Sequence, residues 1–164
     1  AYIVKARVQL IRDLGCLQSP QNAFYVNQGL ETLPLRMERH SANALKVAEF
    51  LSNHPKVEQV FYPLLANSSE LALANKYLPK GVLSFKLKGT KDDCAQFVDK
   101  LKLINVKVHV ADIKTIVLHP ASSSHRQLTD EQLAQAGISP NLIRLSVGLE
   151  DVNDIIADLS SALA

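Results

Sequence analysis

The arginine at position 144 is the residue whose surroundings point most directly to chemistry. It lies in the stretch Leu142–Val147, where strongly apolar side chains alternate with less apolar ones. That alternation is typical of a strand with one buried face, and it puts Arg144 on the other face. A guanidinium on a rigid strand can hold a carboxylate through two parallel hydrogen bonds. The pattern alone leaves open a surface arginine paired with a nearby acid and a carboxylate-binding site, and it favours the first.

A second candidate is the polar segment HPASSSHRQLT, residues 119–129, which combines two histidines with several small hydroxyl side chains. No carboxylate stands at a spacing that supports a catalytic triad, and the GxSxG motif is absent. Zinc sites usually need a third protein ligand nearby, so His119 and His125 alone are weak support for a metal. We expect no metal site, and we interpret the serines as partners of backbone groups in a buried irregular loop.

The elements that must position these residues mix helical and strand-like patterns. Apolar residues at helical spacing predict helices over 1–14, 30–51, 68–76, 90–101, 129–137 and 150–163, and the more ambiguous segment 22–30 is also expected to be helical. Short apolar or alternating runs predict strands over 57–62, 82–87, 105–110, 115–118 and 142–147, with a turn over 78–81. Helices come first and strands and helices then mix, which predicts an α+β fold with a small, largely antiparallel sheet covered by helices.

The neighbours of two further side chains predict whether each is buried. Cys94 shares an apolar stripe with Phe97 and Val98, so a buried, inert thiol is favoured over a nucleophile. His40 lies among charged residues, and we expect it at the surface.

The composition narrows the class of protein. The 164 residues are 47% hydrophobic and 21% charged, which suits a globular domain with a real core. The formal charge of +2 is small and the basic residues are scattered, so we expect no nucleic-acid partner and no membrane partner. Cys16 and Cys94 form no CxxC pair, and we expect a reduced, cytoplasmic protein. The strongly apolar first helix suggests a further segment upstream.

Five segments carry a family likeness. They are GLETLPLRMERHSANALKVAEFL, VLSFKLKG, VADIKTIVLHPASSSHRQLTDEQL, AGI and LIRLSVGLEDVNDIIADL. Together they resemble, in order, the C-terminal part of the Cys/Met-metabolism enzymes that use pyridoxal phosphate. The opening AYIVKARVQLIRDLGCLQSPQNAF most resembles the O-acetylhomoserine sulfhydrylase branch of that family.

The resemblance implies a fold and a reaction. The fold is the small C-terminal domain of a fold-type I enzyme, with residues 1–29 as a linker helix and turn toward an upstream domain and residues 30–164 as the substrate-side domain. The partners implied are that upstream cofactor domain and further copies of the enzyme, as a dimer or tetramer. The reaction implied is replacement of acetate by sulfide or a thiol during methionine biosynthesis. Alternatives are a cystathionine γ-synthase, a methionine γ-lyase, or a free-standing amino-acid-binding module.

The resemblance also implies roles for single residues. Arg144, in the motif RLSVGLE, holds the α-carboxylate of the amino-acid substrate. His109 stands where relatives carry a serine or an asparagine that contacts the same carboxylate, and a histidine can still donate a hydrogen bond. The loop that contains His119, Pro120, Ala121 and Ser122 lines and braces the substrate side.

The lysine that carries the cofactor lies in a Ser-x-Thr-Lys type of motif in this family. The lysine-containing segments ANKYLPKG and GTKDD do not match this motif. We therefore expect this chain alone to be inactive and to bind no pyridoxal phosphate, which the intact enzyme would use.

Overall fold

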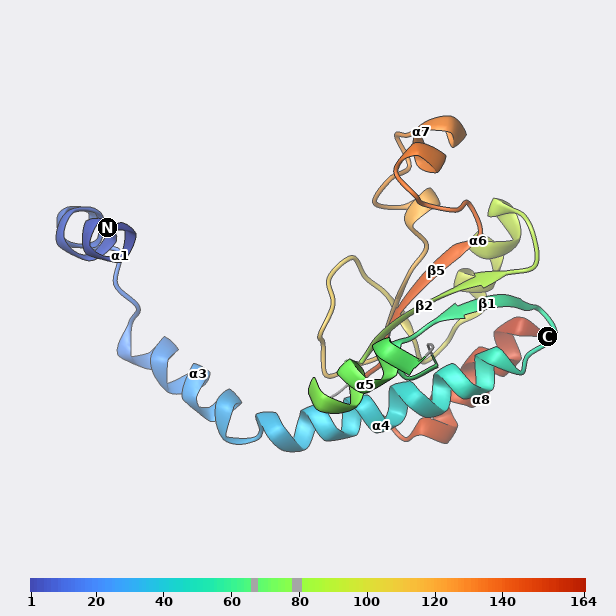
Figure 1. The fold of residues 1–164 in the computed structure, drawn as a ribbon, viewed down its shortest axis with the longest axis horizontal. Coiled ribbons are helices and arrows are strands. Elements are labelled where there is room, and N and C mark those ends of the chain that lie inside the picture. Colours follow the sequence, from blue (N-terminus) through green and yellow to red (C-terminus); the bar gives the residue numbers. More distant parts are fainter. Residues whose placement is uncertain (66–67, 78–80) are drawn as a thin grey trace. The chain divides into compact units, whose positions relative to one another are not determined.

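The computed structural model describes residues 1–65, 68–77 and 81–164 (Figure 1). The chain divides into two compact units, Ala1–Leu35 and Arg36–Ala164. The first unit consists of helices, and the second contains the sheet and the hydrophobic core. The turn predicted over 78–81 lies largely outside the described residues.

The first unit opens with a continuous helical segment. It comprises α1 (Tyr2–Lys5), the π-helix η1 (Ala6–Ile11) and α2 (Arg12–Leu14). Gly15 follows with a φ of 66°, the left-handed conformation that commonly ends helices and that glycine adopts without steric cost. The helix predicted over 1–14 is therefore confirmed.

The helix α3 (Pro20–Glu31) confirms that the ambiguous segment 22–30 is helical. Ser19 caps this helix, because its Oγ accepts a hydrogen bond from the backbone N–H of Asn22 at 3.2 Å. Pro20 occupies the first turn, where its missing N–H leaves no helical hydrogen bond unmade.

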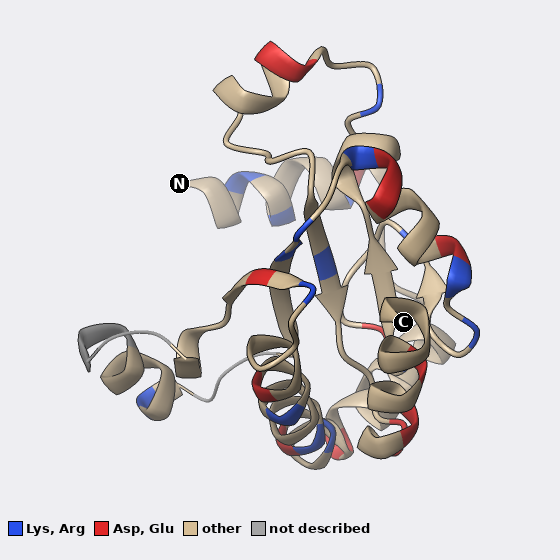
Figure 2. Ribbon diagram, turned by 90° about the vertical axis from the view of Figure 1, so that its right-hand side faces the viewer, with Lys and Arg blue, Asp and Glu red and all other residues tan. Residues whose placement is uncertain are grey.

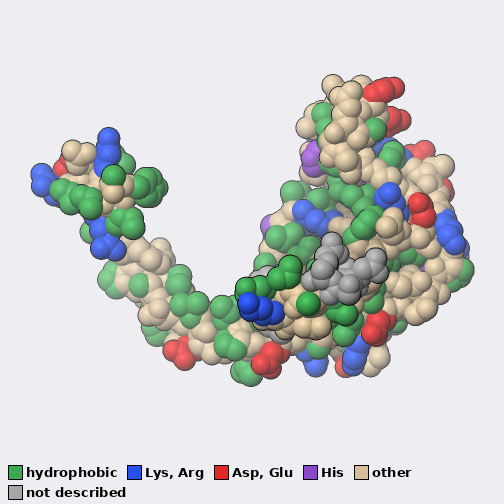
Figure 3. All heavy atoms as spheres, viewed as in Figure 1, with side chains coloured by type: hydrophobic (Ala, Val, Ile, Leu, Met, Phe, Trp, Pro, Cys, Tyr) green, Lys and Arg blue, Asp and Glu red, His purple; other side chains and the backbone are tan. Residues whose placement is uncertain are grey.

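The first unit buries none of its side chains. Residues 1–35 are all exposed or half-buried, and hydrophobic side chains spread over the surface of this segment (Figure 3). Its large apolar residues that are more than half exposed are Tyr2, Ile3, Val4, Val8, Leu10, Leu14, Leu17, Phe24, Tyr25, Val26, Leu30 and Leu35. This unit therefore has no hydrophobic core of its own.

A five-stranded sheet in the order β1-β2-β5-β4-β3 forms the centre of the second unit. Its strands are β1 (Val57–Phe61), β2 (Val82–Leu87), β3 (Asn105–Val106), β4 (Ile116–Leu118) and β5 (Leu142–Ser146). Neighbouring strands are antiparallel except β3 and β4, which are parallel, so the prediction of a largely antiparallel sheet is confirmed. The strand predicted over 105–110 is shorter than expected, because only its first two residues pair with β4.

Three helices supply the apolar side chains that pack against one face of this sheet (Figure 1). They are α4 (Leu33–Ser52), α6 (Lys91–Lys100) and α8 (Val152–Leu163). The sheet contributes the alternating residues Leu83, Phe85 and Leu87 from β2 and Ile143 and Leu145 from β5. The shorter helices are α5 (Ser68–Tyr77), α7 (Asp130–Gln135), η2 (Pro63–Leu65) and η3 (Pro120–Ser122). The predicted helices are present, but α4 begins at Leu33 rather than near residue 30.

Cys94 lies inside this core, as predicted. Its side chain is fully buried, and burial raises the pKa of the thiol to about 11. A thiol that remains protonated at neutral pH is a poor nucleophile, so Cys94 serves as a small apolar packing residue.

Two reciprocal capping boxes begin helices where the sequence predicts them. The Asp93 carboxylate accepts from the backbone N–H of Thr90 at 2.7 Å, and Thr90 Oγ accepts from the N–H of Asp93 at 3.2 Å. Thr129 and Gln132 form the same arrangement at the start of α7. Each box satisfies backbone donors that a helix start would otherwise leave unpaired.

The prediction that His40 lies at the surface is wrong. Its side chain is buried, and its Nδ1 lies 2.7 Å from the carbonyl oxygen of Val147. On the same face of α4, the Asn43 side chain donates to the carbonyl oxygens of Gly148 and Glu150 at 3.0 and 2.9 Å. These polar residues are buried because α4 packs against the turn that follows β5, whose backbone oxygens need donors.

Charges of both signs lie on this unit. Lysines and arginines are interspersed with acidic residues along α4 and α6, whereas the charged residues of α7 and α8 are acidic (Figure 2). Among the described residues, no helix has the length and apolar character needed to cross a membrane.

Candidate functional site

Arg144 lies on the central strand β5, flanked by β2 and β4. The registers place Ser84 of β2 and Leu118 of β4 directly beside it. Its neighbours in sequence, Ile143 and Leu145, are fully buried in the core on the opposite face of the sheet. The alternation predicted from the sequence is thus confirmed, and Arg144 is half-buried on the face that the core does not use.

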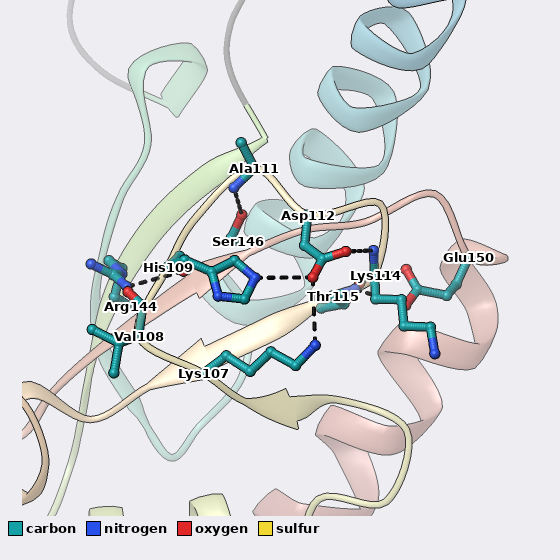
Figure 4. Close-up of polar contacts among 10 residues, drawn as sticks. All are labelled: Lys107, Val108, His109, Ala111, Asp112, Lys114, Thr115, Arg144, Ser146 and Glu150. Atoms are coloured by element: carbon teal, nitrogen blue, oxygen red, sulfur yellow. Dashed lines mark hydrogen bonds and ion pairs between the residues drawn. The ribbon is translucent and has the colours of Figure 1, made fainter. Parts of the chain in front are cut away.

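The guanidinium of Arg144 is held by backbone oxygens. Its Nη2 donates to the carbonyl oxygen of Val108 and, at 3.3 Å, to that of His109 (Figure 4). Within the residues that the structure describes, Arg144 forms no ion pair, and its Nε and Nη1 groups have no hydrogen-bond partner. The arrangement leaves donors for a ligand, and the described ranges offer no acid that would make Arg144 an ordinary surface ion pair.

An open pocket adjoins Arg144 on the same face of the sheet. Its lining residues are Phe61, Ser84, Lys86, Gly137, Ser139 and Leu142. Ser84 is the cross-strand partner of Arg144, so the pocket lies next to the backbone of this residue, although Arg144 itself does not line it. A small polar molecule can occupy a pocket of this kind, which shares the exposed face of the sheet with Arg144.

His109 lies beside Arg144, but the contact between them is made by its backbone. The side chain is more than half exposed, and its Nε2 lies 3.0 Å from Oδ2 of Asp112. Because an ionised carboxylate has no proton to give, the imidazole nitrogen is the donor. This hydrogen bond is the main cause of the lowered pKa of Asp112, about 2. The structure thus brings His109 to the site, with one ring nitrogen already bonded.

The loop His119–Ser122 begins directly after the strand partner of Arg144, Leu118. His119, Pro120 and Ala121 are buried, whereas Ser122 is exposed. No described hydrogen bond joins these residues to the guanidinium. The loop therefore borders the site without contacting its charged group.

The hydrogen bonds of His119 define its protonation. Its Nε2 lies 2.7 Å from the carbonyl oxygen of Pro140, which can only accept, so Nε2 carries the proton. Its Nδ1 then accepts from Ser122 Oγ at 2.8 Å. Burial lowers the pKa of His119, which favours this neutral form. His119 thus ties the end of β4 to the residues that lead into β5.

Sequence reasoning missed the role of Glu150, which it placed only at the start of the helix predicted over 150–163. Its carboxylate accepts from the backbone N–H of Thr115 at 2.7 Å and from Thr115 Oγ at 2.8 Å. Thr115 Oγ in turn accepts from the N–H of Gly148 at 2.9 Å. These contacts join the turn after β5 to the start of β4, so they connect the strand that carries Arg144 to one of its two neighbours. No local pattern signals them, because the partners are 33 to 35 residues apart.

The described residues contain no cluster of three or more histidine, cysteine, aspartate or glutamate side chains that could hold a metal ion.

Comparison with known proteins identifies the family. Residues 2–164 match the family model described as Cys/Met metabolism PLP-dependent enzyme. The chain belongs to this family.

Relatives within the family share almost the whole of this chain. O-acetyl-L-homoserine sulfhydrylase of Leptospira meyeri is 50% identical over 99% of the chain and 38% of its own length. L-methionine gamma-lyase of Fusobacterium nucleatum subsp. polymorphum is 44% identical over 93% of the chain and 40% of its own length. A crystal structure named as an O-acetylhomoserine (thiol)-lyase of Campylobacter jejuni, with a pyridoxyl-lysine phosphate, has a TM-score of 0.84 at 43% identity, covering 98% of this chain and 39% of that one. The chain thus spans about two fifths of the length of these relatives.

The residues around Arg144 do not fit the binding of pyridoxal phosphate itself. A lysine that forms an imine with this cofactor needs a sheltered amine that can lose its proton. Lys86 Nζ lies 5.7 Å from the ring centroid of Phe61 at the surface, and Lys107 Nζ pairs with Asp112 at 3.5 Å. Each of these amines already contacts an aromatic ring or a carboxylate of the same chain, so we assign no residue near Arg144 to the cofactor.

Proposed function

We propose that this chain is the C-terminal, substrate-side part of an enzyme like O-acetylhomoserine sulfhydrylase, and that Arg144 binds the α-carboxylate of the acylated homoserine. The observation that carries the proposal is the state of the guanidinium. Backbone oxygens hold it on the face of the sheet that the core does not use, and three of its N–H donors have no partner among the described residues. The name of the Leptospira meyeri relative supports the choice of reaction.

In this reaction acetate leaves the Cγ atom of the substrate, and sulfide or a thiol takes its place. Pyridoxal phosphate, bound by the rest of the intact enzyme, supplies the electron sink that such chemistry requires. The contribution of this chain is orientation, because a carboxylate held at Arg144 limits how the rest of the substrate can lie. The lining serine Ser84, opposite Arg144, offers a further hydroxyl near the same group.

We propose two partners for the chain. The first is an upstream domain of the same protein, which residues 1–29 would join to the substrate-side domain 30–164. The exposed apolar side chains of the first unit support this, since such surfaces mark interfaces. The second is another copy of the enzyme, in a dimer or tetramer.

The second candidate function is that of a methionine γ-lyase or a cystathionine γ-synthase, and the similarity to the Fusobacterium nucleatum γ-lyase favours the former. Arg144 would hold a substrate carboxylate in any of these enzymes. Assaying the intact enzyme with O-acetylhomoserine plus sulfide, and separately with methionine, distinguishes them by product. A protein that binds amino acids but turns over neither substrate would instead be the amino-acid-binding module.

The test of the proposed site uses Arg144→Lys and Arg144→Ala in the full-length enzyme. Lysine keeps the charge but loses the two-pronged geometry, so it should weaken substrate use, and alanine should weaken it more. Loss of a charge-assisted pair in a partly closed site should cost roughly 2–5 kcal/mol of transition-state stabilisation in Arg144→Ala. The measurements are kcat/KM for O-acetylhomoserine and the visible absorption of the bound cofactor, which should survive because its contacts lie elsewhere.

Lys46→Ala serves as the matched control, because Lys46 is an exposed cation on α4. It should leave kcat/KM unchanged. Near-normal kcat/KM in Arg144→Ala would remove Arg144 from the site, and loss of the cofactor absorption would make its role structural.

A further inference from the structure

Two parts of the second unit position the guanidinium of Arg144. The strand β5 fixes its backbone, but both acceptors of its Nη2 group, the carbonyl oxygens of Val108 and His109, belong to the connection between β3 and β4. The direction in which the guanidinium points therefore depends on the conformation of this connection, residues 107–115.

Side chains hold this connection more than backbone pairing does. The N–H of Lys107 donates to the carbonyl oxygen of Val117 at 3.1 Å, and the carbonyl oxygen of Ile113 accepts from Leu149 at 2.8 Å. Between these two points, the one backbone N–H with a described hydrogen bond is that of Ala111, which donates to Ser146 Oγ at 3.1 Å. Ala111 also has a φ of 65°, a conformation that a residue with a Cβ adopts only when its surroundings enforce it.

The carboxylate of Asp112 makes most of the remaining contacts (Figure 4). Its Oδ2 accepts from His109 Nε2 at 3.0 Å and pairs with Lys107 Nζ at 3.5 Å. Its Oδ1 accepts from the backbone N–H of Lys114 at 3.2 Å. One side chain thus ties together residues on both sides of the two carbonyl groups that hold Arg144. The lowered pKa of Asp112 keeps it ionised at neutral pH.

We propose that Asp112 is a positioning residue for Arg144. It holds residues 107–114 in the conformation that presents the carbonyl oxygens of Val108 and His109 to the guanidinium. The proposal rests on the function proposed above, because it takes Arg144 as the ligand of the substrate carboxylate. An exposed ion pair contributes little to global stability, so the loss of Asp112 acts on substrate binding and leaves the fold intact.

The experiment compares Asp112→Ala and Asp112→Asn in the full-length enzyme, with Asp99→Ala as the matched control on the exposed side of α6. In Asp112→Ala, KM for O-acetylhomoserine should rise roughly 2- to 30-fold, the range for residues that act on a site through an intermediate contact. The turnover number should change less, and the thermal unfolding midpoint should match that of the control. Asp112→Asn keeps an acceptor oxygen and should lie between the parent enzyme and Asp112→Ala.

A double-mutant cycle separates positioning from an independent effect. If Asp112 acts through Arg144, then Asp112→Ala should change KM little further in an enzyme that already carries Arg144→Ala. An unchanged KM in Asp112→Ala would overturn the positioning role. So would an equally large rise in KM when Asp112→Ala is added to Arg144→Ala. Neither result would affect the proposed function. Near-normal kcat/KM in Arg144→Ala by itself would overturn the proposed function, and the positioning role with it.

Discussion

His119 and Arg144 satisfy their hydrogen-bonding groups in different ways. His119 is buried, and both of its ring nitrogens are bonded to groups of the same chain. Arg144 uses one nitrogen on backbone oxygens and leaves two without a partner in the described ranges. A fully bonded buried side chain stabilises a structure, whereas unused donors beside a pocket can bind a ligand. His119 is therefore part of the scaffold, whereas Arg144 keeps donors that a ligand can use.

The neutral state of His119 predicts a dependence of stability on pH. Burial lowers its folded-state pKa below the ordinary value of about 6.5, so the unfolded chain binds the proton more readily than the folded chain does. The contribution of His119 to the stability of the folded chain is therefore complete above its pKa in the unfolded chain. This contribution is lost as the pH falls through its lower pKa in the folded chain. Urea unfolding at pH 7.5 and at pH 5.5 gives the free energy of unfolding at each pH. Between the two, this free energy should fall more in the parent chain than in His119→Gln. The control variant His54→Gln should show the same fall in unfolding free energy as the parent chain. An equal fall in His119→Gln would contradict the neutral state that we assign to His119.

At the scale of elements, the turn between β5 and α8 controls how the strand that carries Arg144 meets the helices. His40 and Asn43 of α4 bind its carbonyl oxygens, and Thr115 binds both Gly148 and Glu150. The turn is consequently enclosed by a helix on one side and by the start of β4 on the other. It leaves no room for a side chain at its centre.

Replacing Gly148 should test this enclosure. A Cβ at this position would lie 2.3 Å from Glu150 Oε2 and 2.4 Å from the backbone nitrogen of Thr115. Gly148→Ala should therefore destabilise the chain by about 1–3 kcal/mol, the usual range for overpacking, as measured by chemical unfolding. Gly29→Ala provides the opposite control, because a Cβ there meets nothing within 4 Å and alanine favours a helix. An unchanged stability in Gly148→Ala would mean that the turn can move aside.

At the scale of the whole chain, the two units differ in what stabilises them. The second unit buries a continuous hydrophobic core, whereas the first unit buries no residue. Isolated short helices are only marginally stable in water, so the first unit depends on surfaces outside itself. The relatives are more than twice as long as this chain, which is consistent with such a surface in the upstream part we propose.

The exposed apolar side chains predict that the isolated chain associates with itself. Light scattering of residues 1–164 at rising concentration should show species larger than a monomer, and a dye that binds apolar surface should fluoresce. Residues 36–164 alone should do so much less, because they lack most of this surface. A clean monomer of the full 164 residues at high concentration, without dye binding, would contradict the prediction.

The sequence by itself determined the features that depend on neighbours along the chain. The alternation in 142–147 showed which way Arg144 faces, the stripe around Cys94 showed its burial, and apolar spacing placed helices that start near residues 90 and 129. These features could be predicted because strand alternation, helical spacing and capping act over a few residues. The alternation alone favoured a surface ion pair over a binding site as the interpretation of Arg144. The family likeness then favoured the binding site.

Only the tertiary structure decided which distant groups meet. His40 was expected at the surface, but it is buried because a carbonyl 107 residues away needs a donor. The acceptors that hold Arg144 are carbonyl oxygens 35 and 36 residues before it, in a connection whose helical or strand spacing gives no sign of this contact. Hydrogen bonds of this kind depend on how the elements pack, and packing is a property of the whole fold that no local spacing encodes.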